Sequence, residues 1–381
     1  MTDPIYLDYN ATTPVAPEVL AAMLPWLRDQ FGNPSSTHPF GRRAAQAVAT
    51  ARRQVADLIG AQPQEIVFTG CATEANNLAL LGVAEALGSL KRHLVISAVE
   101  HPAVMAPAMR LREQGWQVTV LPVDPFGQVS PRRMADALRA DTALVSVRHA
   151  NNEVGTLQPV TEIAQLMRGR GILLHTDAAQ SAGKLPLNVD ELGVDLLTLA
   201  GHKFYAPKGV GALYVRGGTP IRAVLHGAEQ EHGLRPGTEN VAAIVALGAA
   251  AALARDSLAT IPSHMHAMRD RLHERLAAAI PGLQLNGHPE HRLPNTLHVS
   301  FPGVGGRALL NEAAHVVAAS VGSACHSEHD AVSGVLAATG ADAARAAGAV
   351  RLSVGRMTPA DEIERAALGL IAAWQRLALP R

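Results

Sequence analysis

Hydrophobic positions along this chain follow two patterns that alternate from residue 42 to residue 215. Apolar residues recur at helical spacing from Arg42 to Ile59, and Gly60 ends that pattern, so we expect a helix there. Further helices are expected at 17–30, 74–87, 131–140, 160–169 and after residue 240. Short apolar runs predict buried strands at 65–69, 93–99, 118–123, 143–148, 172–177, 195–200 and 210–215. Strands separated by helices predict an open, mostly parallel seven-stranded α/β sheet with helices on both faces.

The composition of the chain changes near Asp256 and Pro262, where we place the end of a large domain. Beyond this point we expect helices at 264–280, 306–313 and 359–377, and strands at 296–301, 316–322 and 350–355. The prediction is therefore a large domain, residues 15–256, and a smaller α+β domain formed by residues 1–14 and 257–381. Residues 1–40, apart from the helix at 17–30, are expected to form ordered loops that line a cleft.

Charge and composition exclude several classes of partner. The 381 residues include 33 basic and 33 acidic side chains, so no basic face favours nucleic acid or an anionic membrane. The start of the chain shows no signal-peptide pattern, and the longest apolar stretch, 241–254, is too short to span a bilayer. Two cysteines give no disulfide framework, and we expect a cytoplasmic protein. Cys325-His326 with His329 is only a weak metal pattern, so no metal is expected.

Polar residues gather where the predicted strands end. The carboxyl ends of parallel strands form the edge at which such sheets bind ligands. Lys203 follows a buried run, which suits a desolvated lysine that forms a Schiff base, although a surface loop lysine has the same local pattern. Asp177 ends a buried run and needs a cationic partner or a strong donor. The full set is Thr73, His101, Asn152, Asp177, Gln180, His202 and Lys203.

The segment GCATEANN (70–77) joins a strand to the start of a helix and predicts an anion site. Backbone N–H groups and the positive end of the helix dipole face such a turn, and its small residues let a phosphate approach. Cys71 in this turn is expected to be a small packing residue. Thr238, in RPGTEN before a long apolar helix, is expected either to cap that helix or to contact a phosphate.

These features together favour pyridoxal 5′-phosphate (PLP) as the cofactor. PLP needs a lysine for its aldehyde and an acidic partner for its pyridine nitrogen, and the turn and a ring-stacking histidine complete such a site. The acidic partner keeps the nitrogen protonated, so the ring can accept electrons from a carbanion. Cys325 would add a nucleophile outside the cofactor, the alternative being an inert buried thiol.

The chain closely resembles the NifS/IscS-like cysteine desulfurases, which belong to the class V aminotransferase family with PLP fold type I. This resemblance implies a homodimer that converts L-cysteine to L-alanine, leaving a persulfide on Cys325 for a sulfur-acceptor protein, as in iron–sulfur cluster assembly. It covers nearly the whole chain and rests on motifs in this order: YLDYNATTP, FGNPSSTH, FTGCATEANN, AVEHPAV, ANNEVGTLQP, HTDAAQSAGK, GHKFYAPKGVGALYVR, RPGTEN, GSAC and RLSVGR.

The resemblance assigns roles around the cofactor ring. Lys203 would hold the cofactor through a Schiff base and move the Cα proton of the substrate. His101 would stack on the ring and assist that proton transfer. Asp177 would pair with the pyridinium nitrogen, and Gln180 would contact the ring hydroxyl.

The resemblance also assigns the residues that bind the phosphate and the substrate. Asn152, beside the cofactor, and Arg351 would bind the substrate carboxylate, for which arginine offers a bidentate fork. Arg351 could instead be a structural salt-bridge residue. The residues expected to hold the phosphate are Ala72, Thr73, His202 and, across the homodimer, Thr238.

Some motifs depart from the desulfurase pattern and indicate an alternative substrate. Ala200 stands where most desulfurases have serine, and HGAEQE (226–231) replaces HGGGQE. The segment SVGSACHSEH (320–329) looks more like the animal selenocysteine lyases, whereas Pro102-Ala103 follows the desulfurase pattern. The alternative substrate is therefore L-selenocysteine, with selenide as product. The sequence also leaves open a plain aminotransferase, which gives Cys325 no role, and a partner-activated sulfur-carrier scaffold.

Overall fold

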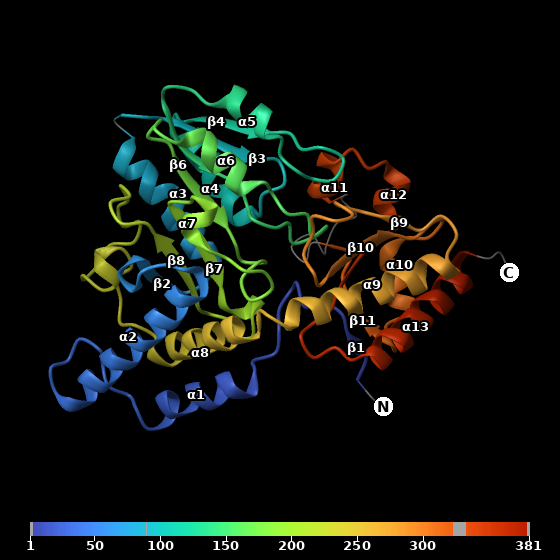
Figure 1. Ribbon diagram of the computed structural model, residues 1–381, viewed down its shortest axis with the longest axis horizontal. Helices are drawn as coiled ribbons and strands as arrows, with labels where there is room; N and C mark the ends of the chain where they lie inside the picture. The colour runs from blue at the N-terminus through green and yellow to red at the C-terminus, as the bar shows by residue number, and fades with distance from the viewer. Residues whose placement is uncertain (1–2, 89, 323–332, 379–381) are drawn as a thin grey trace.

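The computed structural model describes residues 3–88, 90–322 and 333–378, which form a larger and a smaller body side by side (Figure 1). The larger body contains the strands β2 (Ile66–Thr69), β3 (His93–Ser97), β4 (Gln117–Leu121), β5 (Thr142–Ser146), β6 (Leu173–Asp177), β7 (Leu196–Ala200) and β8 (Gly211–Val215). Its helices are α1 (Pro17–Arg28), α2 (Pro39–Ile59), α3 (Ala72–Leu87), α4 (Pro102–Glu113), α5 (Pro131–Ala137), α6 (Val160–Met167), α7 (Val189–Leu192) and α8 (Val241–Ser257).

These seven strands form one sheet in the order β2-β8-β7-β6-β5-β3-β4. Strands β3 to β7 run parallel, and β8 is antiparallel to both of its neighbours, β7 and β2. Strand β2 therefore points the same way as the parallel strands. The predicted mostly parallel sheet is confirmed, and the carboxyl ends of β2, β3, β5, β6 and β7 meet at one edge.

Helices cover both faces of this sheet, because successive strand side chains point to opposite faces. On one face, Val145 and Leu197 belong to a core cluster that includes side chains of α2, α6 and α8. On the other face, the neighbouring Leu144 and Leu196 pack in a cluster with α3 and α4. Apolar runs without alternation were therefore the correct signal for strands buried on both faces.

The smaller body has its own apolar core and is built on an antiparallel sheet of β9 (Gln284–Leu285), β10 (Thr296–Ser300) and β12 (Ala349–Ser353). The strand β1 (Ile5–Tyr6) pairs in parallel with β11 (Val317–Ala318), and Ile5 and Leu7 pack in this core. The domain boundaries at 14/15 and 256/257 stay a prediction. The helices are α9 (Ile261–Ala279), α10 (Gly306–Glu312), α11 (Gly334–Ala338), α12 (Ala343–Ala347) and α13 (Ala360–Ala378).

The expected strand over 316–322 is wrong in its length. Strand β11 has only two residues, because its partner β1 has only two. Ser320 instead forms an isolated bridge with Arg351, and Gly322 has a φ of 125°, outside the range of a strand. An apolar run predicts strand-forming tendency, but the partner decides how far the strand extends.

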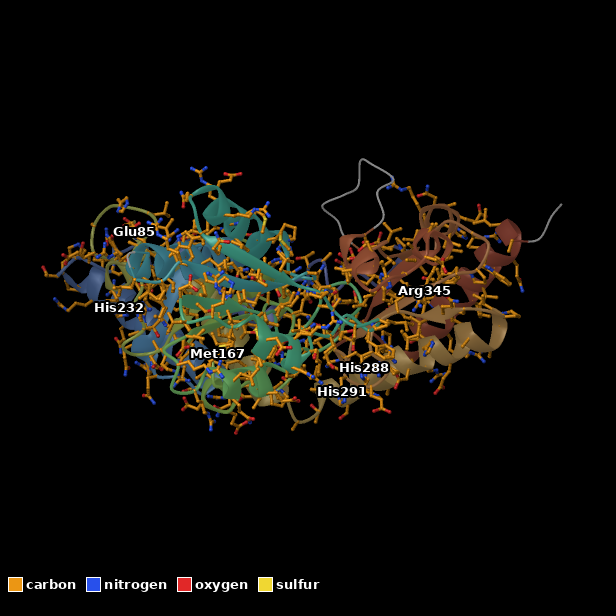
Figure 2. All side chains as sticks on the ribbon, turned by 90° about the horizontal axis from the view of Figure 1, so that it is seen from above. Glu85, Met167, His232, His288, His291 and Arg345 are labelled. Atoms are coloured by element: carbon orange, nitrogen blue, oxygen red, sulfur yellow. The ribbon has the colours of Figure 1, made fainter. Side chains whose placement is uncertain are left out.

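The two bodies are joined by backbone contacts as well as by the chain. Seen from above, His288 and His291 lie where the bodies meet (Figure 2). The N–H of Leu157 donates to the carbonyl of His291 at 2.9 Å there. Within the described ranges, no single helix is long and apolar enough to cross a membrane; α8 and α9 meet that test only as a pair, with a 77° bend between them.

Candidate active site

A chamber of about 200 Å³ lies at the carboxyl edge of the large sheet. It is lined by the start of α3, by the residues that follow β3, β5, β6 and β7, and by the turn after β7. The strand-end residues predicted from sequence therefore converge on one space. Those that line it are Ala72, Thr73, His101, Asn152, Asp177, Gln180, His202 and Lys203.

Asp177 is 5% exposed and stays ionised despite its burial. Burial alone would raise its pKa, but the charge of Arg148 and hydrogen bonds outweigh it, so the pKa lies below the ordinary value. Asn76 Nδ2 donates to Oδ2 at 2.9 Å, and the N–H of Ala179 donates to Oδ1 at 2.9 Å. The prediction that Asp177 needs a cation or strong donors is confirmed.

Lys203 follows β7 in a short 3-10 turn, and its side chain is partly buried between the chambers. Its Nζ donates to the carbonyls of Asn10 at 2.6 Å and Ala11 at 2.7 Å. Burial, together with the charge of Arg351, lowers the pKa of Lys203 to about 8. This position excludes the alternative that Lys203 is a surface loop lysine. Because of the lowered pKa, a fraction of the amine is neutral and nucleophilic near neutral pH.

His101 is the N-cap of α4, where Nδ1 accepts from the N–H of Ala103 at 3.0 Å. Burial and the charge of Arg148 lower the pKa of His101 to about 4, so the ring is neutral. Because Nδ1 acts as an acceptor, the single ring proton belongs on Nε2. His101 therefore offers an N–H donor on the side away from the helix.

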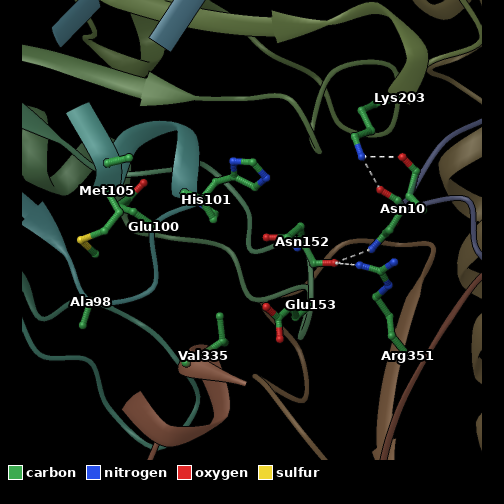
Figure 3. A pocket seen from close by; sticks show the side chains of 14 residues that line it. Asn10, Ala98, Glu100, His101, Met105, Asn152, Glu153, Lys203, Val335 and Arg351 are labelled. Atoms are coloured by element: carbon green, nitrogen blue, oxygen red, sulfur yellow. Dashed lines mark hydrogen bonds between the residues drawn. The ribbon is translucent and has the colours of Figure 1, made fainter. Parts of the chain in front are cut away.

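A second chamber of about 490 Å³ adjoins the first, and His101, Asn152 and Lys203 line both. Its other walls include Glu100, Met105, Glu153 and Val335; Glu100, Met105 and Val335 lie across the space from Lys203, Asn10 and Arg351 (Figure 3). The residues predicted to hold a cofactor thus line the inner chamber, and the outer chamber leads from Lys203 to the smaller body.

Arg351, on β12, is 2% exposed and engaged by groups of this chain. Its Nη2 donates to Asp8 Oδ1 at 2.7 Å, and its Nη1 to the carbonyl of Asn152 at 3.0 Å. Its Nε is buried and has no hydrogen-bond partner among the described residues. Arg351 therefore forms a salt bridge and also lines the outer chamber, so both roles suggested by the sequence are compatible.

The turn between β2 and α3 has the form of an anion cradle. Gly211 on β8 lies so close that a Cβ there would be 2.9 Å from the carbonyl carbon of Cys71 and 3.1 Å from the nitrogen of Ala72. The first N–H groups of α3 have no partners within the helix and border the inner chamber. Cys71 is exposed, so the expectation that it is a packing residue is wrong.

His202 completes the polar wall beside Lys203. Its Nδ1 lies 3.2 Å from Thr12 Oγ1. Burial and the charge of Lys203 lower the pKa of His202 to about 4, so it is a neutral donor or acceptor. A neutral imidazole can offer one N–H to a phosphate.

Two predicted residues are not brought into the chambers by the described chain. Thr238 is exposed and does not cap α8, because Asn240 accepts from the N–H of Ala243 instead. Cys325, with His326 and His329, lies outside the described residues. The residues on both sides of 323–332 approach the same side chain, Glu153. Ser333 Oγ donates to Glu153 Oε2 at 2.5 Å, and a Cβ on Gly322 would lie 3.1 Å from the same oxygen.

Four residues of the site were missed in the sequence. Asn10 supplies a backbone carbonyl, which any residue could supply, so its side chain gave no signal. Glu100 and Arg148 are charged residues at the ends of buried runs, and Lys184 ends the segment HTDAAQSAGK, so these three were visible as charges next to apolar strands. Burial raises the pKa of Glu100 to about 7, and one of its oxygens, Oε2, has no partner in the described part of the chain.

Comparison with known proteins gives consistent matches. The model of the aminotransferase class-V family matches residues 5–366. A cysteine desulfurase IscS from Dictyoglomus turgidum (strain DSM 6724 / Z-1310) is 45% identical over 360 residues, which cover 94% of this chain and 91% of the relative. Another IscS, from Anaeromyxobacter sp. (strain Fw109-5), is 47% identical over 367 residues, which cover 96% of this chain and 91% of the relative.

Two solved structures are similar over nearly their whole length. A NifS-like protein matches with a TM-score of 0.91 and 37% identity, covering 97% of this chain and 98% of its own. The structure of SspA in complex with cysteine matches with a TM-score of 0.82 and 38% identity, covering 92% of this chain and 98% of its own.

Proposed function

This chain belongs to the class-V aminotransferase family and, within it, to the cysteine desulfurases, and we propose that it converts L-cysteine to L-alanine with Cys325 as the sulfur acceptor. The observation that carries the proposal is the position of Lys203, a partly buried lysine that lines both chambers. On one side are Asp177 and the anion cradle, and on the other is Arg351. We therefore expect the cofactor on one side of this lysine and the amino acid on the other.

The residues of the inner chamber fit pyridoxal 5′-phosphate. The buried, ionised Asp177 suits a protonated ring nitrogen, and the free N–H groups at the start of α3, with His202, suit a phosphate. Lys203 is the amine that would hold the aldehyde. Bound there, the cofactor supplies a ring that withdraws electrons from the substrate carbon.

The chain's own residues would then handle the substrate and its protons. Arg351 binds the carboxylate, Lys203 accepts the proton from Cα, and the neutral His101 assists that transfer by donating a hydrogen bond from Nε2 on the chamber side. The thiolate of Cys325 attacks the sulfur of the substrate, so a sulfur–sulfur bond forms and the carbon–sulfur bond breaks. The electron pair stays with the carbon, which takes up a proton to give alanine, and the persulfide remains on Cys325.

Alanine release from L-cysteine and L-selenocysteine, by the wild type and by Cys325→Ala, tests this function. We expect both substrates to react and the substitution to abolish only the cysteine reaction, because selenium leaves more readily without a thiol acceptor. A wild type that uses selenocysteine alone would make the enzyme a selenocysteine lyase, as the sequence around Cys325 suggests. Unchanged rates in Cys325→Ala would refute its role.

Attachment of the cofactor has a separate test. Borohydride reduction of the holoenzyme, followed by peptide mapping, is expected to label Lys203. A label on another lysine would contradict the site described above.

The homodimer is part of the proposal and is supported by exposed apolar side chains on the face formed by α1 and the residues that follow it. Phe31 is 78% exposed and Leu27 61% exposed, beside a cleft of about 570 Å³ between α1, α2 and α8. Monomers rarely expose such neighbouring apolar groups. A second copy on this face would cover them, and Thr238 would be free to reach the phosphate of the other subunit. A holoenzyme that sediments as a monomer would contradict this.

A sulfur-acceptor protein and a cytoplasmic location complete the proposal. Without an acceptor, Cys325 stays occupied after one turnover, so we expect about one alanine per chain in a rapid first phase. Added dithiothreitol, as a substitute acceptor, should restore steady turnover. A rapid first phase that releases clearly more than one alanine per chain, with only a few equivalents of L-cysteine and no dithiothreitol, would argue against a persulfide on the enzyme.

A further inference from the structure

A second buried lysine, Lys184, lies next to the inner chamber and is only 5% exposed. Its Nζ donates to two oxygens of one residue, the backbone carbonyl of Gln180 at 3.0 Å and the side-chain Oε1 of Gln180 at 3.1 Å. Both bonds are buried. Neither the family motifs nor the chemistry described above gives this lysine a task.

The contacts of Gln180 assign the orientation of its amide without ambiguity. A lysine ammonium has only donors, so the atom facing Lys184 must be the oxygen. On the other side, Nε2 donates to the carbonyl of Asn10 at 2.9 Å, and a carbonyl only accepts. Both neighbours therefore require the same orientation, although an amide in isolation can be turned either way.

This orientation has a consequence for the inner chamber, which Gln180 lines. The Nε2 group carries two hydrogens, and the bond to Asn10 uses one of them. The other is available to a ligand. If Oε1 and Nε2 were exchanged, the chamber would face a carbonyl oxygen, which repels the oxygen of a ring hydroxyl once ionised.

We propose that Lys184 is a positioning residue that holds the Gln180 amide so that an N–H donor, rather than an oxygen, faces the ring of the cofactor. The inference rests on the cofactor site proposed above. The network continues to the reactive lysine, because the Asn10 carbonyl that accepts from Gln180 also accepts from Lys203 at 2.6 Å. Lys184, Gln180, Asn10 and Lys203 thus form one connected chain of hydrogen bonds.

Donation, and not charge, is the property of Lys184 that this role needs. Burial, with the charges of Lys203 and Arg351, lowers the pKa of Lys184 to about 7, so part of the population is neutral at neutral pH. A neutral amine still has two hydrogens for its two bonds to Gln180. The amide orientation therefore persists on both sides of that pKa.

The test uses the holoenzyme and the pH at which the absorbance of its lysine-linked cofactor changes. Lys184→Met leaves an unbranched side chain that is one heavy atom shorter and removes the donor. We expect cofactor affinity to fall about tenfold, because Oε1 of Gln180 is left buried without a partner. We also expect the absorbance transition to move upward by about half a pH unit or more, because a lost donor to the ring oxygen favours the protonated linkage.

Two further variants separate donation from charge. Lys208→Met is the matched control, since it removes the same charge at an exposed position five residues from Lys203. In a Gln180→Leu background, Lys184→Met should have no further effect on the transition. The inference is overturned if Lys184→Met behaves like wild type, if Lys208→Met shifts the transition equally, or if the shift persists in Gln180→Leu.

Failure of the cofactor site itself would be recognised separately. A wild type that borohydride does not label at Lys203 would refute the proposed function and this inference with it. If Lys184→Met does not fold, Gln180→Glu keeps an oxygen toward Lys184 and replaces the N–H donor with a second oxygen that shares a negative charge. It should raise the transition in the same direction, and an unmoved transition would overturn the inference.

Discussion

Asp8 and Arg351, 343 residues apart in sequence, form an ion pair in which Nη2 lies 2.7 Å from Oδ1. The residue expected to bind the carboxylate of the substrate thus already holds a carboxylate of this chain. An incoming amino acid has to share the guanidinium with Asp8 or displace it. Asp8 side-chain exposure of 21% shows that water reaches the pair from one side.

Asp8→Asn is expected to have opposite effects on stability and on substrate binding. Unfolding of the apoenzyme in urea should require about 1–3 kcal/mol less free energy, because a buried cation loses its ionic partner. The KM for L-cysteine should fall, since the competing carboxylate is gone. A KM that rises instead would mean that Asp8 assists the substrate.

The reaction of the apoenzyme with added PLP is expected to follow the pKa of Lys203. Only the neutral amine attacks an aldehyde, so the reconstitution rate should rise with pH and level off above about 8. An ordinary lysine would level off above about 10.4. Arg351→Gln should move the midpoint upward, because the charge of Arg351 contributes to the lowered pKa of Lys203. A midpoint near 10 in the wild type would contradict the desolvated position.

Glu100→Gln is expected to stabilise the apoenzyme at alkaline pH. The pKa of Glu100 is about 7 when folded and near its ordinary value of 4.5 when unfolded, so the folded state binds the proton more tightly. Stability is therefore lost as the pH rises from 4.5 through 7. The effect of Glu100→Gln on the free energy of unfolding should therefore be more stabilising at pH 8 than at pH 5 by roughly 2 to 3 kcal/mol. Thermal unfolding of both proteins at both pH values measures this difference. A stability difference that does not change with pH would refute the raised pKa.

Two substitutions at His101 should separate helix capping from proton transfer. Asparagine also caps helices, so His101→Asn should keep the melting temperature and lose the Nε2–H donor. We expect kcat to fall about 10²- to 10⁴-fold. His101→Ala should lose a similar factor in kcat and also about 1 kcal/mol of stability, because the N–H of Ala103 loses its acceptor. Full activity in His101→Asn would reduce His101 to a structural residue.

Gly322→Ala is expected to slow sulfur transfer without affecting the cofactor. The φ of 125° disfavours a side chain, and a Cβ would press on Glu153 Oε2 at 3.1 Å. Since small displacements of a reacting group cost about 10²-fold in rate, alanine release should fall by about that factor while cofactor absorbance stays normal. Gly303→Ala is the control, with a φ of 71° and no neighbour within 4 Å among the described residues. Equal losses in both variants would point to backbone strain alone.

How much of this site the sequence could predict depends on what each residue contributes. Asp177, His101 and Lys203 were visible because a polar residue directly follows a buried run, and parallel strands bring such positions to one edge. The contribution of Asn10 is a carbonyl, and no side-chain pattern encodes a carbonyl's position. The task of Lys184 depends on the amide of Gln180, which only the folded chain places beside it.

The fold shows the same distinction. The seven strands of the large sheet were predicted because each apolar run is its own signal. The short β1 and β11 stabilise each other across more than three hundred residues; the apolar run of β11 was predicted as a strand, whereas β1 was not. The partner, which sequence periodicity does not reveal, determined the ends of both strands.

The contacts of the N-terminal segment 5–13 depend on how much of the chain has been translated. Its carbonyls at Asn10 and Ala11 hold Lys203, and Asp8 binds an arginine that the ribosome adds 343 residues later. Contacts of such long sequence separation form late, since loop closure has to precede them. Asp8 therefore meets its partner only after β12 has emerged. A nascent chain that already contains every residue of the large sheet would still lack the arginine expected to bind the carboxylate of the substrate.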